Sequence, residues 1–412
     1  MRIHFLSNSP KVKSGFSKVT ENLARELMKL GHDCVMTGMQ TTVVPEYYDL
    51  GDNFKLECLP LSTNLDEVSQ FQQNIMITNP DVVIYVGEAY TDVFRLAKFF
   101  PKTISYVPIE GVGIPQYMIN DLNGIVKRGG KVIAQCQYGY NEMKRCGVNV
   151  EKWIYHGYDT NIYKPIDNWD SKELISFAKC VDGKWTQMTD MPMNKLKSEF
   201  KGKFVYLFVG QNNLLRKRIE LLLEAFNIFI NEFPRQKRDR IHLHLHTLPR
   251  SPTGLDLLDY IELYKLDIKD NISFSYGTWR SSGFSEEGLN ILYNLADCFV
   301  SATSSEGYGL GHIESMACGI PQITPDCTSL TELVGTGENA RGLLAKIKME
   351  HTIQDLTKRG LVDIVDLANK MKIMYQNNED RERYSKNCLL FVQPYSWKKI
   401  ANEFDNVIKQ MV

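Results

Sequence analysis

A chain of 412 residues is too long for one ordinary hydrophobic core, so its length predicts two or three domains. Hydrophobic residues make up 43% of the chain and charged residues 24%, which are the proportions of a globular protein in water. The formal net charge of −1 lacks the basic excess that contacts to a nucleic-acid backbone require. We therefore expect no nucleic-acid partner.

The cysteines and the first residues indicate the compartment. Nine cysteines are scattered singly without a Cys-x-x-Cys pair, which favours free thiols in a reducing cytoplasm. Residues 1–7 read as a short strand rather than a signal peptide, and no apolar run reaches transmembrane length. We expect a soluble cytoplasmic protein. Peripheral membrane contact stays open, because Lys11, Lys13 and Lys18 would favour an anionic surface, and the oligomeric state is not indicated.

Residues 1–165 alternate strand-like and helix-like segments. Val19, Leu23 and Leu27 recur at helical spacing and predict an amphipathic helix over 17–30. A second helix is predicted over 138–145, and the predicted strands are 2–6, 34–37, 55–59, 81–86, 103–107 and 131–135. Such alternation predicts a parallel sheet with helices on both faces.

The second half repeats this alternation after a break. Residues 166–202 are weakly periodic and predict a linker with a helical insertion. Strands are then predicted at 204–209, 241–246, 272–276, 298–302 and 322–324, and helices at 219–233, 255–264, 285–294, 313–317, 362–375, 380–392 and 396–412. Two doubly wound sheets in tandem predict a binding crevice at the carboxyl ends of their strands.

The stretch from Ser304 to Pro321 is the most informative. A buried strand leads into a glycine-rich turn and then a short helix, which points backbone N–H groups and a positive dipole end at an anion. Glu306 and Glu314 flank this turn, and carboxylates accept hydrogen bonds from hydroxyl groups. The pattern predicts a ligand with a pyrophosphate and hydroxyls. The alternative is a turn that serves only strand–helix packing.

The turn after the first strand lacks a dinucleotide fingerprint. It holds one glycine, Gly15, and no Gly-x-Gly-x-x-Gly pattern. Nicotinamide chemistry is therefore not expected.

The segment from Glu306 to Glu314, with seven residues between the two glutamates, resembles the signature of the family-4 retaining glycosyltransferases. Weaker likenesses are Gly15 with the helix after it, residues 153–159, Arg216-Lys217 and the segment from Ser396 to Ile400. The resemblance implies an α/β GT-B fold of two Rossmann-like, doubly wound parallel-sheet domains that face a cleft. It implies an acceptor domain at 1–165, a linker or insertion at 166–202, a nucleotide-sugar donor domain at 203–392 and a C-terminal helix at 393–412 that returns to the first domain.

The resemblance also implies roles for single residues. Lys217 and Arg216 would stabilise the departing pyrophosphate, and Glu306 would face the donor sugar. Glu314 would bind the ribose hydroxyls. The further donor-binding candidates are Gly15, Gly210, Gln211, His246, Trp279, Gly309, Leu310 and Gly311. Of these, the last three would offer backbone N–H groups to the distal phosphate, and Trp279 would stack on the base unless it is only buried at the domain surface.

Three residues depart from the family pattern. Gln211 stands where many members have an arginine, and Arg216 could compensate for it. Glu110 stands in a loop where members often have a histidine, and it could orient the acceptor hydroxyl or stabilise an oxocarbenium-like charge. The alternative for Glu110 is an ordinary loop acid beside a turn glycine. His312 replaces a small residue or proline and has no assigned role.

Histidines 242, 244 and 246 alternate along one predicted strand and so share one face, as metal ligands could. Ordinary sheet alternation explains them better, because apolar residues alternate with them on the other face and no fourth ligand is evident. We expect no protein-bound metal and no cofactor apart from a nucleotide-diphosphate sugar as substrate.

The sequence therefore predicts a retaining glycosyltransferase that moves a sugar from a nucleotide-diphosphate donor to a hydroxyl of a glycan, lipid, protein or small molecule. One alternative is a nucleotide-sugar-binding subunit without turnover, which Gln211 and the missing histidine motivate. Another is a phosphorylase or epimerase of the same fold. The base, sugar and acceptor are not indicated.

Overall fold

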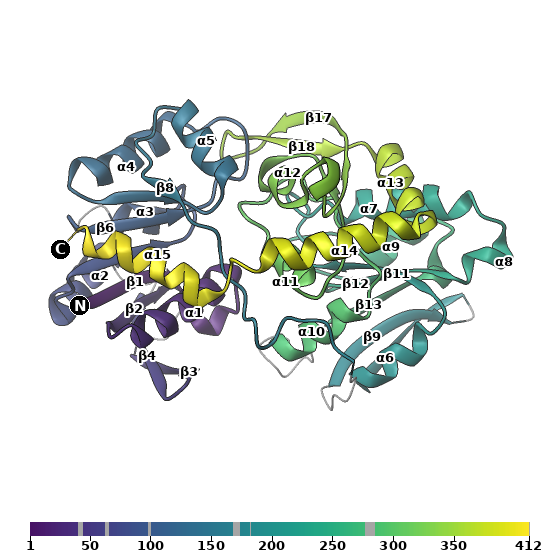
Figure 1. Cartoon of the computed structure of the whole chain (residues 1–412), viewed down its shortest axis with the longest axis horizontal. Helices are drawn as coiled ribbons and strands as arrows, with labels where there is room; N and C mark the ends of the chain where they lie inside the picture. Colours follow the sequence, from purple (N-terminus) through teal and green to yellow (C-terminus); the bar gives the residue numbers. More distant parts are fainter. Residues whose placement is uncertain are drawn as a thin grey trace. The chain divides into compact units, whose positions relative to one another are not determined.

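The structure, a computed structural model, describes residues 1–39, 44–61, 66–97, 100–167, 174–181, 183–276 and 285–411. The chain divides into two compact units, shown in Figure 1. Unit 1 comprises Met1–Tyr158, Gln354–Thr357 and Pro394–Val412, and unit 2 comprises Asp159–Ile353 and Lys358–Gln393.

Unit 1 is built on an eight-stranded sheet. Its strands are β1 (Arg2–Asn8), β2 (Asp33–Met39), β3 (Glu46–Gly51), β4 (Phe54–Leu61), β5 (Val82–Val86), β6 (Thr103–Val107), β7 (Lys131–Ala134) and β8 (Lys152–Trp153). They lie in the order β3-β4-β2-β1-β5-β6-β7-β8, and every neighbouring pair is parallel except β3 with β4. Every residue of β5 and β6 is buried, because helices cover both faces of a parallel sheet.

The helices of unit 1 include one from the end of the chain. They are α1 (Gly15–Lys29), α2 (Glu67–Thr78), α3 (Asp92–Ala97), α4 (Gln116–Lys127), α5 (Gln137–Arg145) and α15 (Trp397–Lys409). The last helix, α15, packs against α1, and Asp405 of α15 lies 3.0 Å from Nε2 of His32, the residue that follows the α1 turn. The sequence did not predict α2, α3 or α4.

Gly157 lets α15 begin where it does. The N–H of Tyr158 donates to the carbonyl of Tyr395 at 3.0 Å, so the two segments run side by side. A Cβ atom at position 157 would lie 2.7 Å from the backbone of Trp397, the first residue of α15. Only glycine permits this approach.

We therefore predict that Gly157→Ala destabilises the protein by about 1–3 kcal/mol, because the backbone of Trp397 has to shift. The measurement is the free energy of unfolding in denaturant. The matched control is Gly124→Ala within α4, where the nearest atom is the flexible end of Arg128 at 3.6 Å. The control should gain up to about 1 kcal/mol of helix propensity. Equal stabilities of the two variants would contradict this account of the α15 contact.

Unit 2 holds a second eight-stranded sheet. Its strands are β9 (Leu174–Val181), β10 (Lys184–Pro192), β11 (Phe204–Val209), β12 (Ile241–His246), β13 (Ile272–Tyr276), β14 (Cys298–Val300), β15 (Gln322–Pro325) and β16 (Gly342–Ala345). The order is β10-β9-β13-β12-β11-β14-β15-β16. From β13 to β16 all neighbours are parallel, so the predicted strands of this half are confirmed as one parallel set.

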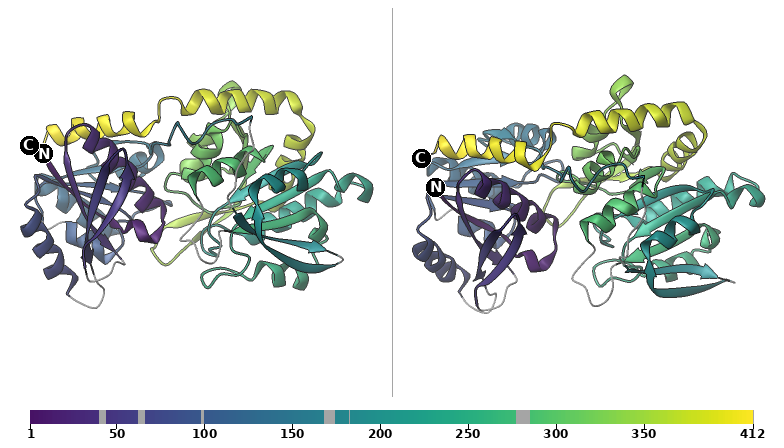
Figure 2. Two further views of the ribbon diagram at one scale, coloured as in Figure 1. Left: turned by 90° about the horizontal axis from the view of Figure 1, so that it is seen from below. Right: turned by 60° about the horizontal axis from the view of Figure 1, so that its bottom comes forward.

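Residues 174–181 and 184–192 correct the prediction of a helical insertion. They form the antiparallel hairpin of β9 and β10, which extends the edge of the sheet beside β13, as Figure 2 shows. Only α6 (Met193–Glu199) of the 166–202 stretch is helical among its described residues. Residues 175–178 of β9 are all buried, so the alternation by which a half-exposed strand is recognised is absent.

The remaining helices of unit 2 are α7 (Ile219–Asn231), α8 (Arg235–Arg238), α9 (Leu257–Leu263), α10 (Glu286–Asn294), α11 (Leu310–Ala317), α12 (Thr328–Val334), α13 (Ile364–Gln376) and α14 (Asn378–Val392). A two-stranded hairpin, β17 (Ile347–Thr352) with β18 (Lys358–Val362), precedes α13. The hairpin, β16 and α12 were not predicted. Among the helices that the structure describes, none combines the length and the apolar composition that a membrane span requires.

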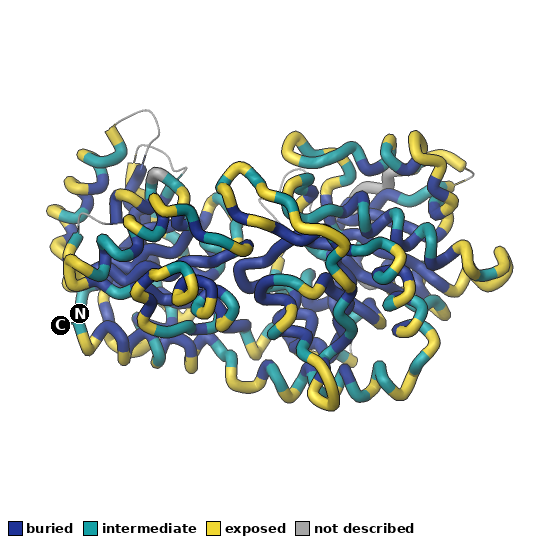
Figure 3. The backbone as a smooth tube through the Cα atoms, turned by 90° about the horizontal axis from the view of Figure 1, so that it is seen from above, coloured by how far each residue is buried: buried dark blue, intermediate teal, exposed yellow. Residues whose placement is uncertain are grey.

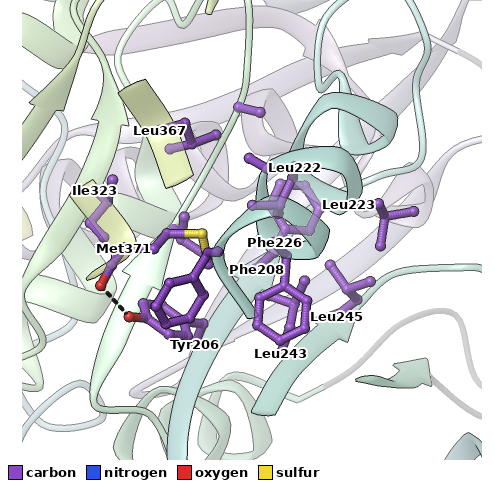
Figure 4. Packing of buried hydrophobic residues seen from close by; sticks show 14 of the residues in the cluster. Tyr206, Phe208, Leu222, Leu223, Phe226, Leu243, Leu245, Ile323, Leu367 and Met371 are labelled. Atoms are coloured by element: carbon purple, nitrogen blue, oxygen red, sulfur yellow. Dashed lines mark hydrogen bonds between the residues drawn. The ribbon is translucent and has the colours of Figure 1, made fainter. Parts of the chain in front are cut away.

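The core of unit 2 lies between α7, α13 and the sheet. Leu222 and Phe226 of α7 pack over β11 and β12 in Figure 4, and the hydroxyl of Tyr206 donates to the carbonyl of Met371 at 2.6 Å. Buried backbone fills the interior of each unit in Figure 3, and the central strands β5, β6 and β12 are buried along almost all of their length. This rigid packing fixes the loops at the carboxyl ends of β11 and β14, where the candidate site lies.

Candidate active site

The loop between β11 and α7 is shaped by Asn213. Its side-chain oxygen accepts the N–H groups of Leu215 and Arg216 at 3.1 and 3.2 Å, and its carbonyl accepts the N–H of Lys217 at 2.9 Å. An asparagine that bonds the backbone two residues on is a turn former. A Cβ at Gly210, at the start of this loop, would lie 3.0 Å from the ring of Phe208, so a larger residue would press on that ring.

The turn after β14 is bonded to this same loop. Ser304 donates its N–H to the carbonyl of Arg216 at 2.8 Å, and the hydroxyl of Thr303 donates to that carbonyl at 3.0 Å. The strands β11 and β14 are neighbours in the sheet, so their loops meet at one edge. Arg216 and Lys217 are thereby fixed relative to the turn that carries Glu306.

Glu306 is a buried carboxylate held by two cations. Its Oε1 pairs with Nζ of Lys217, and its Oε2 lies 3.3 Å from Nη1 of Arg216. Glu306 is only 6% exposed. Burial alone would raise the pKa of this carboxyl, but the charges of Lys217 and Arg216 outweigh it and lower the pKa to about 2. Glu306 is therefore ionised throughout the neutral range.

The N-terminus of α11 follows three residues later. Gly309 precedes the helix with φ of 105°, a left-handed conformation that favours glycine, and no side chain caps the helix. In the described residues the N–H groups of Leu310 and Gly311 have no partner, and both residues are half-buried. Unpaired first-turn N–H groups and the helix dipole favour an anion.

Glu314 lies one turn further along α11 and is 4% exposed. The hydroxyl of Tyr293 on α10 donates to its Oε2 at 2.9 Å. A Cβ at Gly311 would lie 3.3 Å from that same hydroxyl, so the small residue lets Tyr293 reach the carboxylate. The two glutamates of the motif thus have different partners: Glu306 has cations and Glu314 has a phenol.

His312 is neutral and orders the first turn of α11. Nε2 of Gln322 donates to Ser315 and to the carbonyl of Ile320, so its oxygen is left to accept from Nδ1 of His312 at 2.9 Å. Burial lowers the pKa of His312 to about 4. His312, which departs from the family pattern, is therefore held by Gln322, and its ring lies beside Gly309.

His246 is the last residue in a row of hydrogen-bonded side chains from β12 and β13. Ser273 and Ser275 of β13 alternate with the histidines, at 2.7 Å to His242, at 2.8 and 2.7 Å to His244 and at 3.0 Å to His246. Burial lowers the pKa of His244 to about 3 and of His246 to about 4. The serines bond both ring nitrogens of His244 and one ring nitrogen each of His242 and His246. Within the described ranges, no group of three or more His, Cys, Asp or Glu side chains could hold a metal ion.

The remaining predicted residues lie in unit 1, in the loop after β11 or outside the described residues. Gly15 is the exposed first residue of α1 in unit 1, and Glu110 is half-buried in the loop between β6 and α4 of the same unit. Gln211 is exposed in unit 2. Trp279 lies outside the described residues. The structure therefore groups Arg216, Lys217 and Glu306 at the end of the sheet in unit 2, and the individual roles stay predictions.

Several contacts of this site were missed by sequence reasoning. Asn213, Ser304, Tyr293, Thr328 and Ser329 all bond the motif or its loops. Of these, only Asn213 carried a usable signal in the sequence, because asparagine commonly forms turns. A turn at Asn213 would have placed Arg216 in a defined position. The others are single polar residues whose partners lie far away in sequence.

These two Rossmann-like units define the fold of the GT-B glycosyltransferases. Sucrose-phosphate synthase of Thermosynechococcus elongatus has the same fold, with a TM-score of 0.74 over 100% of this chain and 99% of that chain, at 16% identity. The crystal structure of Anabaena Alr3699/HepE in complex with UDP and glucose matches with a TM-score of 0.69 over 100% of both chains, at 15% identity. The predicted fold is confirmed.

Residues 203–363 match the family model described as glycosyl transferases group 1. The serotype-specific mannosyltransferase WbdA of Escherichia coli is 31% identical over 125 residues, which span 29% of this chain and 13% of that protein. The uncharacterized glycosyltransferase MJ1178 of Methanocaldococcus jannaschii is 24% identical over 62% of this chain and 67% of its own. The matched family segment contains the whole Glu306 cluster.

We predict that Lys217→Met raises the pKa of Glu306 above its ordinary value of 4.5, because burial then faces only the charge of Arg216. The measurement is a pH titration of the glutamate side-chain ¹³C signals, assigned with Glu306→Gln. In the unmodified protein, ionised Glu306 stabilises the fold above about pH 4.5, and this contribution is lost as the pH falls towards 2. An unshifted titration in the variant would contradict the assigned ion pair.

Proposed function

We propose that the protein is a retaining glycosyltransferase of family 4, which moves a sugar from a nucleotide-diphosphate sugar to an acceptor hydroxyl. The observation that carries this proposal is the buried Glu306 held by Lys217 and Arg216 beside the N-terminus of α11. This arrangement offers cations and backbone N–H groups to a diphosphate and carboxylates to hydroxyls. The family match over residues 203–363 and the GT-B fold support the same class.

The donor would lie along α11 with its diphosphate at the helix N-terminus. Leu310 and Gly311 would donate their N–H groups to the distal phosphate, and Glu314 would accept from the ribose hydroxyls. The Anabaena structure contains UDP and glucose, and WbdA is named a mannosyltransferase. UDP-glucose and GDP-mannose are therefore the first donors to test.

The transfer itself needs stabilisation of the leaving diphosphate. The bond between the sugar C1 and the phosphate oxygen breaks, and a bond from C1 to the acceptor oxygen forms on the same face. The acceptor proton passes to the departing phosphate oxygen. Lys217 and Arg216 neutralise the charge that develops there, while Glu306 keeps both cations in place. We propose that Lys217 and Arg216 stabilise the leaving diphosphate without a metal held by the protein.

The acceptor side belongs to unit 1 in this proposal. Glu110, at the carboxyl end of β6, would orient the acceptor hydroxyl of a glycan, lipid or other compound, and Gly15 would let the backbone approach the phosphates. The reaction would take place in the cytoplasm or at a membrane surface.

We predict that Glu306→Gln and Lys217→Ala each lower the rate of donor hydrolysis and of transfer by a factor of about 100 or more. Lys217→Ala removes a positive charge at the leaving group. Glu306→Gln removes the carboxylate that holds Lys217 and Arg216 in place. The measurement is nucleotide release from a panel of nucleotide sugars, with and without acceptors.

The matched controls are Glu199→Gln and Lys179→Ala. These two residues form an ion pair at 2.6 Å in the same unit, between α6 and β9. The controls should retain the full rate. Full activity in Glu306→Gln or Lys217→Ala, with folded protein, would refute the proposed function.

The anomeric configuration of the product tests whether the transfer is retaining. Because attack on the same face preserves configuration, an α-linked donor should give an α-linked product, and proton NMR of the first product formed reads this directly. A β-linked product would show an inverting displacement instead.

A second candidate is a nucleotide-sugar-binding subunit without turnover. It is favoured by Gln211, which leaves one fewer cation beside the phosphates than many family members have. Calorimetric binding of a nucleotide sugar without hydrolysis or transfer would support it. Phosphate-dependent cleavage of an oligosaccharide, or epimerisation without acceptor, would instead reveal a phosphorylase or epimerase.

A further inference from the structure

The first turn of α12 clamps the backbone of Glu306. Oγ1 of Thr328 accepts the N–H of Glu306 at 3.0 Å. The hydroxyl of Ser329 lies 2.9 Å from the carbonyl oxygens of both Glu306 and Tyr308, so its proton is shared between them. Two consecutive residues of one helix therefore hold both backbone polar groups of the buried glutamate.

Thr328 occupies a conformation that a threonine rarely adopts. Its φ is 49°, and in the described part of the chain it is the only β-branched residue with a positive φ. The left-handed region places Cβ against the backbone, and branching at Cβ makes the clash worse. Glycine would take the same backbone path without strain. The backbone conformation therefore does not explain a threonine here.

The hydroxyl is what threonine offers and glycine lacks. Thr328 is 8% exposed and Ser329 is fully buried, so neither hydroxyl serves the surface. Both are directed at the turn that carries Glu306, which in turn pairs with Lys217 and Arg216 from another loop. Strain at functional sites persists where the surrounding structure enforces it.

We propose that Thr328 and Ser329 are positioning residues that set where the carboxylate of Glu306 stands relative to Lys217. The proposal rests on the proposed function of the Glu306 site and adds two residues to it. Neither hydroxyl touches the donor in this account. They act through Glu306, because a displacement of about 1 Å at a reacting centre can lower a rate about 100-fold.

Three substitutions at Thr328 separate this role from a structural one. Thr328→Gly removes the hydroxyl but relieves the strain, so its thermal midpoint should fall less than that of Thr328→Val while kcat falls about 10- to 100-fold in both. Thr328→Val keeps the shape without the acceptor, and kcat should fall similarly. Thr328→Ser keeps the acceptor and should stay within about twofold of the unmodified kcat. A merely structural role would make activity follow stability.

Two further variants complete the test. Ser329→Ala should lower kcat about tenfold and leave the affinity for the nucleotide diphosphate nearly unchanged, because Glu314 and the N–H groups of α11 are not altered. Thr331→Val is the control on the same helix, since its hydroxyl bonds Asp326 at 2.7 Å and not the glutamate turn. Its kcat should be unchanged.

The outcomes divide cleanly. A full kcat in Thr328→Gly, or an equal loss in Thr328→Ser, would overturn the proposal. If the unmodified protein neither hydrolyses nor transfers any nucleotide sugar, the proposed function fails. The contacts of Thr328 and Ser329 with Glu306 are then tested by the side-chain ¹³C signal of Glu306 instead of by kcat. That signal should shift in Thr328→Val and not in Thr328→Ser. An unshifted signal in Thr328→Val would overturn the clamp in an active or an inactive chain.

Discussion

The compensation of one buried carboxylate is the constraint on which the rest of this site depends. Glu306 is nearly inaccessible to water, and an ionised carboxylate in such a place needs both cations and hydrogen bonds. Lys217 and Arg216 supply the charge, and they can do so only because Asn213 and Ser304 fix the loop that carries them. The parallel neighbours β11 and β14 bring the two loops to one edge. Fold and site are linked by this single requirement.

The charges of this cluster suit the diphosphate of the proposed donor. Two cations and one carboxylate leave a net positive charge, and the unpaired N–H groups at the start of α11 add to it. Glu314 stands one turn away and accepts a hydrogen bond from the phenol of Tyr293, so it suits hydroxyl groups rather than phosphate. A ligand with a diphosphate at one end and sugar hydroxyls beside it matches this distribution of charge.

Sequence reasoning predicted the parallel sheets and the glycine-rich turn because each carries a local pattern, whereas the family resemblance alone pointed to Arg216 and Lys217. Apolar runs indicate buried strands, and Gly309 indicates a turn because its backbone takes a positive φ that glycine adopts easily. It failed for β9, because Ser176 interrupts the apolar residues of this buried segment and no regular alternation replaces the run. It also failed for Thr328 and Ser329, since a residue that acts across the fold on Glu306 leaves no trace near it in sequence. Long-range positioning is a property of the folded chain.

The most direct test of this account is a crystal structure of the protein with UDP or GDP bound. The account predicts that the distal phosphate lies at the N–H groups of Leu310 and Gly311, with Lys217 beside the diphosphate and Glu314 at the ribose hydroxyls. A nucleotide bound elsewhere, with Lys217 and Glu306 unaltered and out of contact with it, would contradict the central claim that the buried glutamate and its two cations form the donor site.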